Sequence, residues 1–145
     1  MHKSVQNFIN IENKIKDNLS DLNINNQTKI IAVSKTFKLE KIMPLIDFGH
    51  THFGENKVQE ALEKWSKIKK ENLKIKLHMI GKLQTNKVKL ALQIFDYIHS
   101  VDSEKLAKKI ADEQDKLNRK INIFLQVNIG DENQKSGINK QDIGK

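Results

Sequence analysis

The 145-residue chain carries a formal net charge of +8, but its basic residues lack the pattern typical of nucleic-acid-binding proteins. All 26 basic residues except Arg119 are lysines, spread among 18 acidic residues, whereas nucleic-acid recognition favours arginine forks, clustered basic patches and aromatic platforms. The sequence has no cysteine, which excludes disulfides and thiolate metal sites, and no apolar run long enough for a membrane span or a signal core. We expect one domain over residues 1–145, soluble and cytoplasmic, that binds neither nucleic acid nor membrane.

Segments with helical and strand-like patterns alternate along the chain. Apolar side chains at helical spacing predict helices over residues 3–22, 38–48, 57–70, 84–94 and 103–117. Short apolar or alternating runs predict strands at 30–34, 51–53, 75–80, 97–101 and 121–129. Pro44 lies inside the second helix, which therefore begins late or is kinked, and Asp102 or Ser103 caps the last one. Strands roughly 20–25 residues apart are typical of βα units in a parallel sheet.

Five strands after an N-terminal helix favour an α/β fold, in particular the first five strands of a (β/α)8 TIM barrel. A closed barrel needs eight strands and about 250 residues, fewer in compact cases. Residues 139–145 could only begin another helix, so the chain stops at an unfinished α/β unit. We therefore expect a truncated, partial barrel. An open five-stranded doubly wound sheet would also suit this length, and the pattern of elements leaves it as an alternative.

Lys35 directly follows the first predicted strand, which we expect to be buried because its first four residues, 30–33, are small or β-branched and apolar. In an α/β protein, ligands bind at the carboxyl ends of the strands. An amine held there can lose part of its hydration, which favours its neutral form and makes it a nucleophile towards carbonyl compounds. Alternation along the strands is consistent with Lys35, His78 and Asn128 pointing to the inside of the barrel.

Five motifs stand at the ends of predicted strands, in a fixed order. They are AVSKT at 32–36, HFGEN at 52–56, HMIGKLQTNK at 78–87, IHSVDS at 98–103, and QVNI followed by GDENQKSG at 126–137. In this order and spacing they closely resemble the pyridoxal phosphate homeostasis protein family. The members of that family are single-domain barrels related to the N-terminal domain of alanine racemase, and the resemblance runs from about residue 5 to residue 145.

The resemblance implies a cofactor and three residues that bind it. Lys35 would carry pyridoxal 5′-phosphate (PLP) as an internal aldimine. Asn56, which matches the asparagine of the family's GEN motif, would lie beside the cofactor ring, although an asparagine before a helix also suits an N-cap. His78 would face the lumen near the cofactor, or else be a satisfied core histidine. His50 and His52 could supply two metal ligands, but without a third nearby we expect no metal and a structural role.

Two functions compete on this basis. The resemblance favours a non-catalytic carrier that holds PLP and hands it to PLP-dependent apoenzymes, acting as a monomer. The alternative is an amino-acid racemase, which needs a second acid–base group opposite the lysine. The one tyrosine, Tyr97, lies inside a strand, and the racemase-type sequence KANAYGHG does not follow Lys35. A nucleotide- or sugar-phosphate-binding protein would predict a glycine-rich phosphate loop, which the sequence lacks.

The resemblance also implies that part of the site is missing. Members of the family continue with three further strands, which carry the Ser, Arg, Gly and Thr residues that hold the cofactor phosphate. We therefore expect residues 1–145 alone to bind PLP weakly or not at all.

Overall fold

A computed structural model describes residues 1–25, 28–130, 132–133 and 135–145. Five parallel strands form one sheet: β1 (Ala32–Val33), β2 (His52–Glu55), β3 (Lys76–Met79), β4 (Tyr97–Val101) and β5 (Asn122–Leu125). The helices are α1 (Lys3–Asp21), α2 (Leu39–Phe48), α3 (Val58–Glu71), η1 (Thr85–Lys87), α4 (Val88–Ala91) and α5 (Glu104–Leu117). After β5, a two-stranded sheet of β6 (Val127–Asn128) and β7 (Ile138–Asn139) precedes η2 (Lys140–Asp142). Helices and strands therefore alternate as the sequence predicts.

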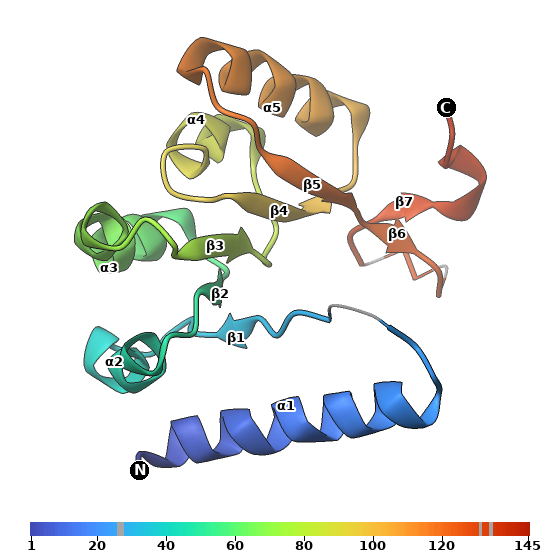
Figure 1. The fold of residues 1–145 in the computed structure, drawn as a ribbon. Helices are drawn as coiled ribbons and strands as arrows, with labels where there is room; N and C mark the ends of the chain where they lie inside the picture. The colour runs from blue at the N-terminus through green and yellow to red at the C-terminus, as the bar shows by residue number, and fades with distance from the viewer. Residues whose placement is uncertain (26–27, 131, 134) are drawn as a thin grey trace.

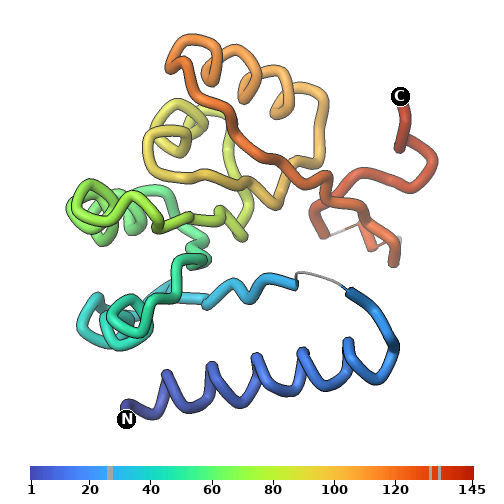
Figure 2. Tube along the Cα trace, viewed as in Figure 1, coloured from blue at the N-terminus to red at the C-terminus, as the bar shows by residue number. Residues whose placement is uncertain are grey.

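The strand order identifies the architecture. The strands are hydrogen-bonded in the order in which they occur in the chain, and α2 to α5 lie along the outer side of the curved sheet (Figure 1). The tube in Figure 2 follows the same curve from β1 to β5, with α1 below β1 in this view. A doubly wound sheet reverses its strand order at a switch point, and this sheet does not. The prediction of five strands of a barrel is confirmed, and the doubly wound alternative is wrong.

The hydrophobic core lies between the outer face of the sheet and the helices. Phe53, Leu77 and Ile98, one from each of three neighbouring strands, are completely buried. On α3, Trp65 is equally buried, and its ring centroid lies 4.9 Å from that of Phe53. Successive strand residues point to opposite faces. The residues that alternate with Phe53, Leu77 and Ile98 along their strands therefore line the inner face of the curve. Strand alternation thus separates a packing face from a face available for a site.

Several predicted boundaries need correction. The first strand pairs only at residues 32–33, and Val33 is 52% exposed rather than buried, because β1 is hydrogen-bonded to β2 alone among the described strands. The helix predicted at 84–94 is a 3-10 turn followed by one α-helical turn. The strand predicted at 121–129 breaks after Leu125. Helix α2 begins at Leu39 and runs through Pro44, so it does not begin late.

Helix α1 packs beside α2, at the edge of the sheet formed by β1. The rings of Phe8 and Phe48 meet edge to face, with centroids 6.0 Å apart. In the parts of the chain that the structure describes, no helix is both long and apolar enough to cross a membrane.

Candidate functional site

Lys35 occupies a turn at the carboxyl end of β1. β1 pairs with β2 at Val33 and Gly54, and Lys35 and Asn56 each follow that pair by two residues, past the ends of their strands, at the edge where ligands bind in α/β proteins. Lys35 is exposed. The partial loss of hydration that the sequence led us to expect at its amine is therefore not seen. Within the described residues, that ammonium makes no ion pair or hydrogen bond. The structure thus places Lys35 and Asn56 after the carboxyl ends of neighbouring strands and leaves the lysine amine without a partner among the described residues.

The backbone of this turn is held on both sides of the lysine. The N–H of Ser34 donates to the carbonyl of Gly54 at 2.9 Å, and the N–H of Phe37 donates to the carbonyl of Ser34 at 3.2 Å. Between them, Thr36 has a φ of +67°. A β-branched residue rarely adopts this left-handed conformation, so its neighbours must hold it there. Lys35 therefore projects from a turn of fixed and unusual geometry.

Asn56 does not cap a helix, contrary to that interpretation of the sequence. Helix α3 begins two residues later, at Val58, so Lys57 holds the cap position and makes no side-chain cap bond. The Oδ1 atom of Asn56 is buried and has no hydrogen-bond partner among the described residues. Gly81 packs directly against Asn56, since a Cβ at Gly81 would lie 2.5 Å from the Asn56 carbonyl oxygen. The carboxyl edge of the sheet thus contains, just after β2, a buried acceptor that none of the described residues uses.

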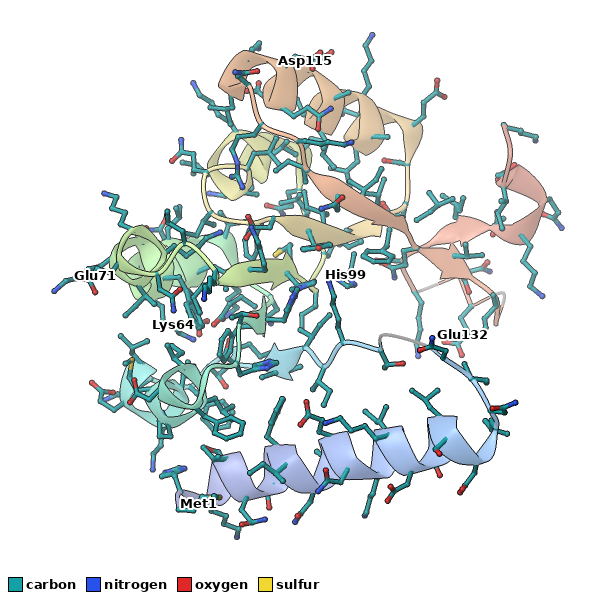
Figure 3. All side chains as sticks on the ribbon, in the orientation of Figure 1. Met1, Lys64, Glu71, His99, Asp115 and Glu132 are labelled. Carbon is teal, nitrogen blue, oxygen red and sulfur yellow. The ribbon has the colours of Figure 1, made fainter. Side chains whose placement is uncertain are left out.

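His78 lies on the inner face, deeper in the sheet than this edge. It pairs in register with Gly54, two residues before Asn56. Its Nε2 lies 2.9 Å from Nδ1 of His52, and its Nδ1 lies 2.9 Å from Nε2 of His99. These three side chains form a row across β2, β3 and β4, which we call the histidine row; Figure 3 labels His99. The predicted inward direction of His78 agrees with the structure, but its ring nitrogens are occupied by other histidines.

Aromatic rings cover the histidine row. The ring of Tyr97 stacks on His78, with centroids 4.2 Å apart and 9° between the planes, and Phe124 stacks on His99 at 4.5 Å. Burial, together with the neighbouring His99 and His52, lowers the pKa of His78 from 6.5 to about 4. Burial also lowers the pKa of both of those neighbours. Near neutral pH the row is uncharged, and the central ring of His78 can donate to one neighbour and accept from the other.

His50 and Asn128, the remaining residues singled out in the sequence, have other partners. Nε2 of His50 lies 2.7 Å from the carbonyl oxygen of His52, and its ring packs on Phe8 and Phe53. No group of three or more His, Asp or Glu side chains in the described residues is arranged to hold a metal ion. Asn128 belongs to β6 rather than to the main sheet, and its amide donates to the carbonyl of Glu132 at 2.7 Å. It therefore does not join the inward-facing residues of the main sheet.

Comparison with known proteins identifies relatives along most of the chain. The pyridoxal phosphate homeostasis protein of Haemophilus influenzae is 34% identical over 142 residues, covering 97% of this chain and 60% of that protein. The corresponding protein of Pasteurella multocida is 40% identical over 110 residues, covering 76% and 47%. The chain spans about half the length of the curated relatives it matches.

Solved structures give the same result. PipY of Synechococcus elongatus is 35% identical, with 84% of this chain and 57% of that chain covered. The TM-score is 0.72 for PipY without PLP and 0.70 for PipY with PLP bound. A family model described as the alanine racemase N-terminal domain matches residues 11–145. The order of parallel strands, the lysine at the end of β1 and these matches agree: the chain belongs to the family of the alanine racemase N-terminal domain, together with the pyridoxal phosphate homeostasis proteins.

Proposed function

We propose that this chain binds PLP through the amine of Lys35 and serves in the homeostasis of that cofactor as a carrier. The observation that carries the proposal is the Lys35 amine, which has no partner among the described residues, projects from a fixed turn and stands at the carboxyl edge of a barrel sheet. A structure of the relative PipY with PLP bound supports the choice of cofactor.

The residues at the sheet edge fit such a ligand. When bound, PLP supplies an aldehyde that condenses reversibly with a primary amine, with loss of water. Lys35 presents that amine, and Oδ1 of Asn56, which has no partner among the described residues, can accept a hydrogen bond from a donor on the ligand. A buried acceptor without a partner is costly in a folded protein. A ligand that satisfies it would therefore gain affinity.

The inner face favours a carrier over a racemase. Racemisation needs a second acid–base group on the opposite side of the substrate carbon from the lysine. Tyr97 lies three strands from β1, roughly 14 Å along the sheet at the usual strand spacing, and its ring stacks flat on His78. The matched relatives are named as homeostasis proteins. A carrier would deliver PLP to apoenzymes that need it, so its recipients are PLP-dependent enzymes.

Borohydride trapping tests the assignment of the lysine. The purified chain is mixed with PLP, reduced and digested, and the labelled peptides are identified by mass spectrometry. We expect the label on Lys35 in clear excess over the other lysines, even if binding is weak, and we expect Lys35→Ala to lose it. Lys38→Ala is the matched control, since Lys38 is also exposed and lies three residues away. Label spread evenly over exposed lysines, or concentrated on a different one, would refute the assignment.

An activity assay tests the carrier interpretation separately. L-alanine is incubated with the PLP-treated protein, and the D-enantiomer is measured by chiral chromatography. We expect no D-alanine above the level produced by free PLP. Racemisation at an enzyme-like rate that disappears in Lys35→Ala would make the protein a racemase.

A further inference from the structure

A buried carboxylate stands on the opposite face of β2 from the histidine row. Glu55, the last residue of that strand, is completely buried among core residues. Its Oε1 atom accepts hydrogen bonds from Ser34 Oγ at 2.8 Å, Lys64 Nζ at 2.9 Å and Trp65 Nε1 at 2.8 Å. Its Oε2 atom has no partner in the described part of the chain. A buried ion pair with an unsatisfied oxygen is weak evidence for a stabilising role, because apolar residues often pack as well or better there.

The partner of this carboxylate reaches the turn that carries Lys35. Lys64, labelled in Figure 3, projects from α3 and has a side chain only 9% exposed. Its Nζ also donates to the carbonyl of Ser34 at 2.9 Å and to Oε1 of Glu60 at 3.1 Å. That same Glu60 oxygen accepts the backbone N–H of Thr36 at 2.7 Å. Two carboxylates and one ammonium group thus connect α3 to both neighbours of Lys35.

The charge state of Glu60 agrees with this arrangement. Burial acts to raise the pKa of Glu60, but the hydrogen bonds from Lys64 and Thr36 outweigh it, and the pKa lies below its ordinary value. At neutral pH the side chain is therefore an ionised acceptor for Thr36. This bond holds the one residue of the turn that has an unfavourable backbone conformation.

We propose that Glu55 is a positioning residue for Lys35, acting through Ser34 and Lys64. Glu55 fixes the hydroxyl of Ser34 directly and holds the Lys64 ammonium against the Ser34 carbonyl. Lys64 in turn orients Glu60, which holds Thr36. The peptide units before and after Lys35 are thereby fixed, so the lysine side chain leaves the turn in one direction, along the carboxyl edge of the sheet. The value of this direction for ligand capture rests on the proposed function, whereas the fixing of the turn does not.

A pair of matched substitutions tests the proposal. Glu55→Gln removes the charge of the buried carboxylate and nearly preserves its size. Glu113→Gln is the control, because Glu113 is also a buried carboxylate, 4% exposed, and pairs with Lys109 and Lys116 on α5, away from the turn. Both changes remove one buried negative charge that faces lysines, so a general effect on stability should be common to both.

Two measurements on the purified chain report on the turn. The first is hydrogen exchange of the Thr36 amide, followed by NMR. The second is the ratio of PLP trapped by borohydride on Lys35 to that trapped on Lys38. In Glu55→Gln we expect exchange at Thr36 to accelerate about tenfold and the trapping ratio to fall about tenfold, since small misplacements of a reacting group have effects of this size or larger. Glu113→Gln should leave both unchanged.

The outcomes separate a positioning role from a structural one. A lower unfolding midpoint in Glu55→Gln, with Thr36 exchange and the trapping ratio as in the wild type, would overturn the proposal. If Glu55→Gln does not fold, Glu60→Ala replaces it, because Glu60 has a side chain 28% exposed and accepts the Thr36 bond directly. If wild-type Lys35 traps no PLP selectively, the proposed function fails, and Thr36 exchange alone still decides whether Glu55 fixes the turn.

Discussion

Removing His78 should weaken the dependence of stability on pH. The pKa of His78 falls from 6.5 to about 4 on folding, so the unfolded chain binds more protons than the folded chain between these values, and acid favours unfolding. Each tenfold change in proton affinity is worth about 1.4 kcal/mol, so the full effect is about 3 kcal/mol, of which about 2 kcal/mol is lost between pH 7 and pH 5. Between pH 7 and pH 5, the free energy of unfolding of His78→Gln should fall by about 2 kcal/mol less than that of the wild type.

Urea unfolding at pH 7 and pH 5 measures this difference, with the buried single tryptophan, Trp65, as the fluorescent reporter. Comparing the loss within each protein cancels the constant effect of the substitution on packing. Glutamine retains one donor and one acceptor group, so it can still bond to both neighbours in the row. His2→Asn is the control, since His2 is exposed and lies outside the row. Equal losses in the wild type and His78→Gln would show that the row does not titrate as the structure requires.

Three further predictions concern close packing and buried or partly buried polar contacts. Gly81→Ala should destabilise the fold by about 1–3 kcal/mol in urea unfolding, because the new Cβ would lie 2.5 Å from the Asn56 carbonyl oxygen. Trp65→Phe should lower the free energy of unfolding by about 1–3 kcal/mol, measured by circular dichroism, because Glu55 loses one of its three donors. Asp96→Asn should cost about 3–5 kcal/mol, again by urea unfolding, because two partly buried cations lose their shared partner.

Short-range signals in the sequence, such as a capping side chain, predict those element ends that depend only on neighbouring residues. Ser103 caps α5 as expected, its Oγ accepting the N–H of Leu106 at 3.1 Å, and the helix begins at the next residue. The region 84–94 differs because its apolar residues are buried without forming a long helix. Leu92 is completely buried, yet it lies in the turn that follows α4. Apolar spacing in this segment therefore reflects the burial of single residues and does not establish a long helix.

Strand alternation and the positions of strand ends predict only which residues face the site, not which side chains pair with one another. Alternation indicates that His78 faces inward, but His52 and His99 join it through the relative register of three strands, which no local pattern specifies. The bond between Glu55 and Lys64 crosses from a strand to the following helix, nine residues away. Its geometry depends on how α3 packs on β2. Pairings of this kind arise from tertiary packing and cannot be predicted from the periodicity of the sequence.

The contacts that fix the lysine turn come from a short and continuous part of the chain. Ser34 and Thr36 are held by Glu55, Glu60 and Lys64, all within β2, α3 and the turn itself. Since β1, β2 and α3 form adjacent βα units, this geometry needs no strand beyond those that the structure describes. The relatives are longer than this chain, but whatever their additional residues contribute to ligand binding, the direction of the lysine is set by the first two βα units. Affinity for the ligand and presentation of the amine are therefore separable properties of the fold.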